Sequence, residues 1–179
     1  MRITFELEPA DIERFQAALA RARAAARSAD EIDVVDAAKY ALDHLLAGAA
    51  PGYVRKRLPG VQQLILMIED DDWALPDPER ADVIETLVYF SDPEDLIPDD
   101  VEVIGLLDDA IMLELLLRRL RYVLTAYSSF CAFRAKLGRP LGTARHAHAA
   151  QLAAQRRVLQ NRMRRARKRY EASRDATIR

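Results

Sequence analysis

Cysteine is almost missing from this sequence of 179 residues: Cys131 is the only one, so no disulfide can form within the chain. A chain of this length can bury a hydrophobic core without such staples. Because Cys131 lies in an apolar helical stretch, we interpret it as a small buried hydrophobic residue rather than a redox or metal-binding group. The first fifteen residues alternate charged and apolar side chains and do not resemble a secretory signal. We therefore expect a cytoplasmic protein.

Glycine and long apolar runs are also scarce. The six glycines leave little room for a phosphate-binding loop, and no Gly-x-Ser-x-Gly turn is present to hold a nucleophile. The most apolar stretch, Val101 to Leu117, contains four carboxylates, which are too costly to place inside a bilayer. These absences exclude a transmembrane helix in that stretch and favour a non-enzymatic role over catalysis.

The net charge of −1 conceals an uneven distribution of charge along the chain. Residues 1–100 hold 10 Lys and Arg and 22 Asp and Glu, whereas residues 101–179 hold 17 and 6. The two parts thus carry net charges of about −12 and +11. No acidic residue lies between Glu114 and Glu171, which is also where the basic residues are densest. The C-terminal part therefore requires an acidic surface nearby.

Apolar residues recur every three to four positions through most of the chain, which indicates packed amphipathic helices. We predict a mainly α fold, an irregular multi-helix bundle whose helices are joined by short breaks. Alternating apolar and polar residues predict a short N-terminal strand, Ile3–Leu7, before the first helix. Helices are expected to begin at Pro9, Tyr53, Val61, Asp77, Leu106 and Thr143, and Pro59-Gly60 is expected to form a break before Val61. A further helix is expected to begin at a capping box formed by Ser28 and Glu31.

The longest apolar pattern runs from Leu106 to Leu137 and predicts a long central helix, which spans roughly 45 Å if it is continuous. Gly138 is a typical residue at the end of a helix, and any kink is expected near Ser128 and Ser129. After a break at residues 139–142, a basic C-terminal helix follows. We therefore divide the chain into a helical domain, residues 1–142, and a basic helical arm, residues 143–179.

The acidic middle of the chain carries a specific motif. It reads Ser-Asp-Pro-Glu-Asp-Leu-Ile-Pro-Asp at residues 91–99, followed by Gly-Leu-Leu-Asp-Asp at residues 105–109. This motif resembles the YkvA-like bacterial domain of unknown function, and the resemblance extends over about residues 84–120. The positions that carry it are Pro93, Asp95, Leu96, Ile97, Pro98, Asp99, Gly105, Asp108 and Asp109. The resemblance implies a helical fold and no particular activity.

Two interpretations of the motif aspartates remain open. As helix caps and loop anchors, they use the preference of Asp for the free N–H groups at a helix start. In the other interpretation, four aspartates supply hard oxygen ligands for Mg²⁺ or Ca²⁺, and the protein is a divalent-metal-dependent enzyme. The four are Asp95, Asp99, Asp108 and Asp109. His146 and His148 add nothing to such a site, because residues two apart lie on nearly opposite sides of a helix. We expect surface histidines, and no cofactor unless the metal interpretation holds.

The basic cluster of the C-terminal helix is the strongest functional indication in the sequence. The apolar seam of this helix requires a partner to pack against. It consists of Ala149, Leu152, Leu159, Met163, Ala166 and Tyr170 and is interrupted by Arg156. Acidic runs within the chain, Glu69–Asp72 and Asp92–Asp100, are one set of charges that this cluster can oppose. We predict an anion-binding surface composed of Arg156, Arg157, Arg162, Arg164, Arg165, Arg167, Lys168 and Arg169.

We therefore predict a non-enzymatic protein that acts through protein–protein interaction or self-association, with its basic helix docking on an acidic surface. One alternative is sequence-nonspecific binding of nucleic acid or of an anionic membrane surface, which places the protein at the membrane periphery. Tyr170 is the only aromatic residue near the cluster, so base stacking is not indicated. The metal-dependent enzyme is the other alternative.

Overall fold

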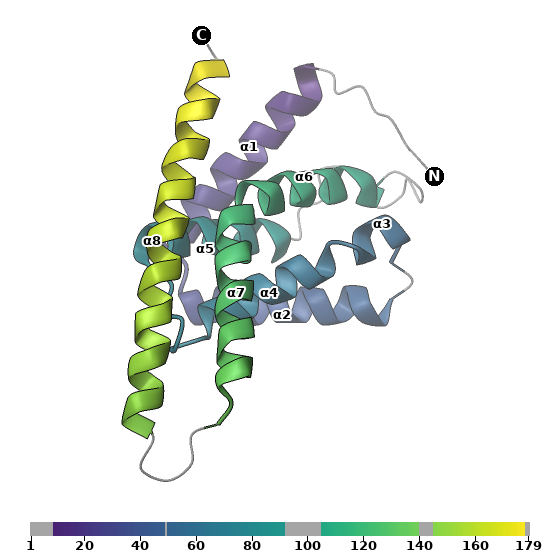
Figure 1. The fold of residues 1–179 in the computed structure, drawn as a ribbon. Coiled ribbons are helices and arrows are strands. Elements are labelled where there is room, and N and C mark those ends of the chain that lie inside the picture. Colours follow the sequence, from purple (N-terminus) through teal and green to yellow (C-terminus); the bar gives the residue numbers. More distant parts are fainter. Residues whose placement is uncertain (1–8, 49, 92–104, 140–144, 178–179) are drawn as a thin grey trace. The chain divides into compact units, whose positions relative to one another are not determined.

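A computed structural model describes residues 9–48, 50–91, 105–139 and 145–177 (Figure 1). Every regular element within these ranges is a helix, which confirms the predicted mainly α fold. The predicted strand Ile3–Leu7 lies outside the described residues. The helices are α1 (Pro9–Ala26), α2 (Glu31–Ala47), α3 (Gly52–Arg55), α4 (Leu58–Ile68), α5 (Asp77–Ser91), α6 (Gly105–Arg119), α7 (Arg121–Leu137) and α8 (Arg145–Thr177).

The chain forms two compact units, each assembled from two separate stretches of sequence. Unit 1 comprises residues 1–65 and 81–118, and unit 2 comprises residues 66–80 and 119–179. The basic helix α8 belongs to unit 2, together with α7 and the loop of residues 69–76. The division at residue 142 remains a prediction from the sequence, and α8 packs against α7 within one unit.

Unit 1 has a core of small and branched apolar side chains, and ion pairs join its helices. Arg23 of α1 donates two hydrogen bonds of 3.0 Å to the carboxylate of Glu85 in α5. The guanidinium of Arg57 lies 3.1 Å from the carboxylate of Glu114 in α6. The core residues are Ala18, Ala22, Val34, Val35, Ala38, Leu42, Val54, Leu58, Val61, Leu64, Ile65, Val83, Ile84, Leu87, Ala110, Met112, Leu113 and Leu116.

The start of α2 differs from the predicted capping box. Asp30 is the N-cap, with φ −69° and ψ 133°, and its carboxylate accepts a 2.8 Å hydrogen bond from the backbone N–H of Ile32. The hydroxyl of Ser28 instead donates to the carbonyl of Ala25 at 3.2 Å, beside the end of α1. Serine and aspartate are both good N-caps, so local chemistry alone does not choose between two candidates two residues apart.

The predicted break at Pro59-Gly60 is wrong, because both residues lie in the first turn of α4. Proline suits this turn, since the N–H groups there have no partner within the helix. Gly60 allows a close approach to α6, because an added Cβ would lie 2.9 Å from a methyl group of Leu117. The dipeptide therefore starts a helix and lets it pack closely.

The predicted central helix is also wrong as a single element, because Leu120 divides it into α6 and α7. The backbone of Leu120 has φ −87° and ψ 5°, a bridge conformation, and its side chain is fully buried. Ser128 and Ser129 lie within an unbroken α7, and their hydroxyls donate to carbonyls four residues earlier. Leucine favours helices, so local propensity does not predict this break. The predicted end of the pattern is confirmed by Gly138, which has φ 71°.

Unit 2 contains α7 and α8 as an antiparallel pair of neighbouring helices (Figure 1). Half of the apolar seam predicted for α8 is buried in this unit, namely Leu152, Leu159 and Met163. The prediction is wrong for Ala149 and Tyr170, which are exposed, and Ala166 is half-buried. The buried apolar residues of this unit are Met67, Ile68, Trp73, Leu75, Leu120, Val123, Ala126, Tyr127, Phe130, Leu152, Leu159 and Met163.

Candidate functional site

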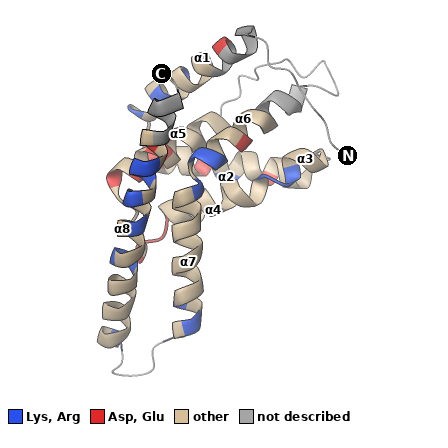
Figure 2. Ribbon diagram, turned by 45° about the horizontal axis from the view of Figure 1, so that its top comes forward, with Lys and Arg blue, Asp and Glu red and all other residues tan. Residues whose placement is uncertain are grey.

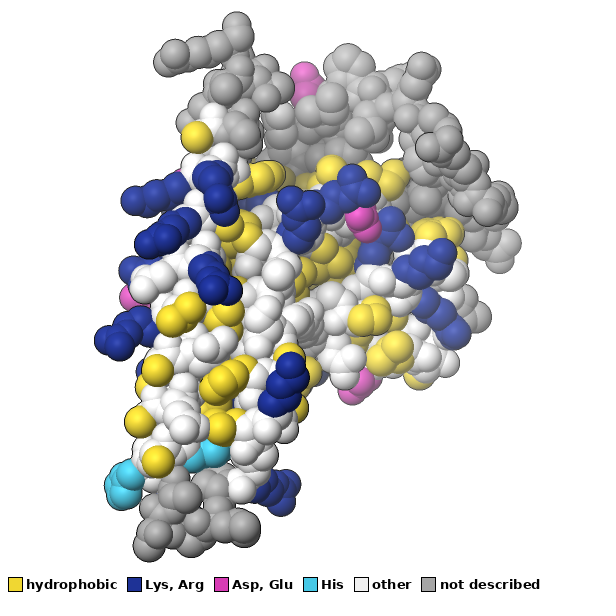
Figure 3. All heavy atoms as spheres, viewed as in Figure 1, with side chains coloured by type: hydrophobic (Ala, Val, Ile, Leu, Met, Phe, Trp, Pro, Cys, Tyr) yellow, Lys and Arg dark blue, Asp and Glu magenta, His cyan; other side chains and the backbone are white. Residues whose placement is uncertain are grey.

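Residues 157–169 of α8 carry a dense set of exposed cations. Basic residues follow one another along the upper part of this helix in the ribbon (Figure 2), and their side chains stand out on the surface in the space-filling view (Figure 3). We call the set the outward face of α8. It consists of Arg157, Arg162, Arg164, Arg165, Lys168 and Arg169, all of which are exposed. Within the part of the chain that the structure describes, none of these six forms an ion pair.

The cations of the outward face repel one another. Side chains three or four residues apart are neighbours on a helix surface, and each such pair of like charges costs about 0.2–0.5 kcal/mol. Arg165 has neighbours of this kind on both sides, at Arg162 and Arg169, and Arg164 faces Lys168. The outward face therefore adds no stability to the fold, and a bound anion would relieve the repulsion.

The opposite side of α8 holds the loop of residues 69–76 through the loop's backbone. Arg156 donates a 3.0 Å hydrogen bond to the carbonyl oxygen of Asp72. One turn further along the helix, the side-chain amide of Gln160 donates to the carbonyls of Trp73 at 2.8 Å and Ala74 at 3.0 Å. These bonds satisfy backbone acceptors that no helix pairs, so they fix the path of the loop.

Arg167 completes this inward side of α8 with an ion pair to a buried carboxylate. Its Nη1 lies 3.5 Å from Oε1 of Glu79, whose side chain is only 2% exposed. Glu79 lies in the first turn of α5, where the helix dipole favours a negative charge. The Nε of Arg167 also lies 2.8 Å from the carboxylate of Glu171. We call Arg156, Gln160 and Arg167 the inward face of α8.

The loop of residues 69–76 is also ordered by its own contacts. The backbone N–H of Trp73 donates to the carbonyl oxygen of Asp70 at 3.1 Å and to its carboxylate at 3.2 Å. Ala74 has φ 44°, a left-handed conformation that costs an alanine roughly 1 kcal/mol. The turn buries Trp73 completely, with its ring centre 5.8 Å from that of Tyr127 and 5.2 Å from that of Phe130. Aromatic packing therefore offsets the strain of the turn.

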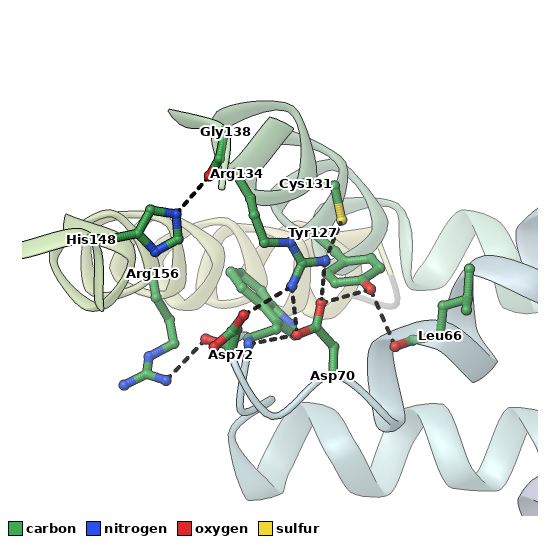
Figure 4. A network of polar contacts seen from close by, with 10 residues as sticks. Leu66, Asp70, Asp72, Tyr127, Cys131, Arg134, Gly138, His148 and Arg156 are labelled. Atoms are coloured by element: carbon green, nitrogen blue, oxygen red, sulfur yellow. Dashed lines mark hydrogen bonds and ion pairs between the residues drawn. The ribbon is translucent and has the colours of Figure 1, made fainter. Parts of the chain in front are cut away.

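Asp70 is the centre of a polar network between this loop and α7 (Figure 4). Its Oδ2 accepts a 3.0 Å hydrogen bond from the hydroxyl of Tyr127 and lies 2.8 Å from Nη2 of Arg134. The Nη1 of Arg134 donates to Oδ1 of Asp70 at 2.9 Å and lies 3.4 Å from the carboxylate of Asp72. The hydroxyl of Tyr127 also lies 3.2 Å from the carbonyl oxygen of Leu66. A single carboxylate thus joins the loop to two side chains of α7.

The charges of this network do not change near neutral pH. Burial by itself would raise the pKa of the Asp70 carboxyl, but hydrogen bonds from Arg134, Tyr127 and the backbone N–H of Trp73 outweigh it and lower that pKa. Burial, followed by the hydrogen bond to Asp70, raises the pKa of the Tyr127 phenol. The hydrogen bond to Asp70 likewise raises the pKa of Arg134. These groups hold the loop in place, and none is poised to transfer a proton at pH 7.

The predicted anion-binding residues therefore separate into two groups. Arg156 and Arg167 belong to the inward face, where they contact Asp72 and Glu79 within unit 2. The other six form the outward face. The acidic run Glu69–Asp72 opposes α8 through the Asp72 carbonyl, which accepts a hydrogen bond from Arg156, while the carboxylates of Asp70 and Asp72 pair with Arg134 of α7. The second acidic run, Asp92–Asp100, lies outside the described residues.

Several residues that hold unit 2 together were not singled out from the sequence. They are Trp73, Glu79, Tyr127, Arg134 and Gln160. An arginine in an apolar helix such as α7 is a signal that sequence analysis can use, because a half-buried guanidinium needs a carboxylate. The identity of that carboxylate depends on the path of the loop and has no local signal.

The motif residues are described only in part. Pro93, Asp95, Leu96, Ile97, Pro98 and Asp99 lie outside the described residues, so the metal site predicted from Asp95, Asp99, Asp108 and Asp109 stays a prediction. Helix α6 begins at Gly105, which places Asp108 and Asp109 in its first turn and a half. Among the residues that are described, no group of three or more His, Cys, Asp or Glu side chains is arranged to hold a metal ion.

Cys131 lies in α7, and two of the three histidines, His146 and His148, lie in the first turn of α8, whereas His44 lies in α2. Cys131 is half-buried rather than fully buried, with its Sγ 3.9 Å from Nη2 of Arg134. His146 is exposed, and the Nε2 of His148 donates to the carbonyl of Gly138 at 2.8 Å. His148 thus ties the start of α8 to the end of α7.

Comparison with known protein families bears on the acidic motif. Residues 83–115 match the family model of a protein of unknown function, DUF1232. The DUF1232 segment overlaps the stretch that resembles the YkvA-like domain and is consistent with that resemblance. It covers less than half of the chain, and its description assigns no activity. No curated protein and no solved structure shows a significant match to the chain.

None of the helices in the described ranges combines the length and apolar character needed to cross a bilayer.

Proposed function

We propose that the protein is a non-enzymatic binding protein whose outward face of α8 docks on an anionic macromolecule. The division of α8 into two polar faces carries this proposal. The inward face is occupied by contacts within unit 2, so its residues build the fold. The outward face makes no such contacts among the described residues, and its six cations are available to a partner.

The charge of unit 2 supports the same function. This unit contains 17 Lys and Arg against 8 Asp and Glu, a net charge of about +9. A concentrated positive field attracts anionic partners and accelerates their association. The single cysteine favours a reducing compartment, so we place this binding in the cytoplasm.

Heparin affinity chromatography tests the proposal directly. The full-length protein should be retained on heparin at low salt, because an extended polyanion neutralises the outward face. The variant R162Q/R165Q/R169Q should elute at clearly lower salt than the unmodified chain. Its circular dichroism spectrum should be unchanged, since these three side chains are solvent-exposed.

A matched variant separates the outward face from net charge. R27Q/K56Q/K136Q removes three exposed cations that lie outside α8 and should elute near the unmodified protein. Equal shifts for the two triple variants would show that only the net charge matters, and absence of retention would contradict the proposed function.

A further inference from the structure

The outward face is organised as two stripes rather than as a diffuse patch. Successive residues of an α-helix are rotated by about 100°, so the direction of each side chain follows from its position. The six cations fall into two groups of three. Around the helix axis, each group spans no more than about 60°, and the centres of the two groups are about 110° apart. One stripe holds Arg157, Arg164 and Lys168, and the other holds Arg162, Arg165 and Arg169.

The surface between the two stripes is narrow and uncharged. Ala154, Asn161 and Ala172 lie along this midline, and all three are exposed. The outward face therefore presents small side chains at its centre and long cations at both edges. Arginine is suited to such edges, because its planar guanidinium binds phosphate oxygens in pairs.

We propose that the partner of this face is the phosphate backbone of duplex DNA, with α8 lying in the major groove; this inference rests on the anion-docking function proposed above. The major groove is about 12 Å wide and admits a helix about 10–12 Å in diameter. Each stripe faces the phosphates of one groove wall, while the uncharged midline faces the groove floor. The cations extend over about 18 Å of helix, a length over which duplex DNA carries roughly ten phosphates.

Other anionic partners fit this face less well. A helix that enters a membrane surface needs a free apolar side, but Leu152, Leu159 and Met163 are buried in unit 2. A protein partner usually needs a buried aromatic or aliphatic anchor. Among the described residues that point outward between 157 and 169, Val158 is the only large apolar side chain, and it is 45% exposed. Duplex RNA has a major groove too deep and narrow for a helix.

Binding of this kind does not distinguish sequences. The six cations reach phosphates, which are the same at every base pair. Asn161 is the only midline side chain able to form hydrogen bonds, and a single amide contact is insufficient to define a site.

Filter binding of the full-length protein to three unrelated 20-base-pair duplexes tests the inference. We expect affinities within about threefold of one another and a slope of log K against log salt of about −5, from six phosphate contacts. Between 50 and 200 mM salt the affinity should fall by about a thousandfold. Each of R162Q/R165Q/R169Q and R157Q/R164Q/K168Q should reduce the slope to about −3 and weaken binding at 100 mM salt at least tenfold. The control R27Q/K56Q/K136Q should stay within twofold.

The contrary outcomes distinguish this inference from the proposed function. If polyglutamate, duplex RNA or vesicles containing phosphatidylglycerol bind as tightly as the duplexes, the assignment to DNA fails while the anion-docking face stands. If only one stripe affects DNA binding, the groove arrangement fails. If none of these polyanions nor heparin is bound, both proposals fail.

Discussion

At the scale of single residues, the charge of Asp70 sets the contact between the acidic loop and α7. Its side chain is only 9% exposed, so its charge depends on the guanidinium of Arg134 and the hydroxyl of Tyr127. A buried carboxylate of this kind stabilises the folded state only while it is ionised. The strength of the loop contact should therefore depend on pH below neutrality.

The variant Asp70→Asn should lower the free energy of unfolding by about 2 kcal/mol at pH 7, because it removes hydrogen bonds to a charged group. The pKa of Asp70 is lowered on folding, so its contribution is complete well above its ordinary value of 3.8 and is lost as pH falls through the lowered value. The stability difference between the two proteins should therefore shrink as the pH falls toward 2. Urea denaturation at pH 7, 5 and 3 measures it.

Asp72→Asn serves as the control for this pH series. The carboxylate of Asp72 is 57% exposed and lies 3.4 Å from Arg134, so its loss should cost less than about 1 kcal/mol. A cost equal to that of Asp70→Asn, or a difference for Asp70→Asn that persists to low pH, would contradict the role assigned to the network.

At the scale of elements, α8 shows how helical periodicity gives different roles to arginines that lie within one turn of each other. Arg164 belongs to the outward face, whereas Arg167, less than one turn away, pairs with the buried Glu79. The two arginines have the same chemistry, so the difference in their environments alone should determine what each contributes to stability. A comparison of the same substitution at both positions isolates that difference.

Replacing Arg167 by methionine should lower the free energy of unfolding by about 3 kcal/mol, because the Glu79 carboxylate then stays buried without this cation. The double variant E79Q/R167M should recover part of the loss, since the buried charge is gone. The same substitution at Arg164 should change stability by no more than about 0.5 kcal/mol. Thermal or urea denaturation measures all three. Equal losses at both arginines, or no recovery in the double variant, would refute the assignment.

The elements also show what the sequence could and could not predict. The end of α7 at Gly138 and the burial of Leu152, Leu159 and Met163 follow from local chemistry and helical period, and both are confirmed. The predicted seam also included Ala149 and Tyr170, which are exposed. The break at Leu120 was not predicted, because it depends on burial and not on helix propensity.

The candidate site was predicted to a similar extent. The density of arginines in α8 locates the basic surface, but the sequence-based prediction assigned all eight basic residues to one surface. The structure separates Arg156 and Arg167 from the other six. The pairing of Arg167 with Glu79 rather than with the run Glu69–Asp72 could not be read from the sequence. It follows from the path of the loop, which long-range packing around Trp73 determines.

At the scale of the whole molecule, the two compact units carry opposite charge. Unit 1 has 10 Lys and Arg against 20 Asp and Glu, a net charge of about −10, and unit 2 has about +9. The total of −1 therefore describes neither unit. Unit 1 of one copy of the chain and unit 2 of another therefore attract each other electrostatically. This attraction acts over roughly 10 Å at 0.1 M salt.

We expect the protein to self-associate at low ionic strength and to dissociate as salt is added. Sedimentation velocity in 20 and 300 mM salt should show a larger average mass in the first buffer, because screening weakens the attraction between units of different copies. R162Q/R165Q/R169Q should reduce that difference, whereas an average mass independent of salt would show that charge does not drive assembly.

Trp73 has one more consequence, because it is the only tryptophan of the chain and its side chain is fully buried. Its emission spectrum is therefore a natural optical label for the loop, without any engineered fluorophore. Light emitted at short wavelength reports an intact turn, and a red shift reports water at the indole. Since far-ultraviolet dichroism averages over every helix, a mismatch between the two melting curves would reveal stepwise rather than concerted denaturation.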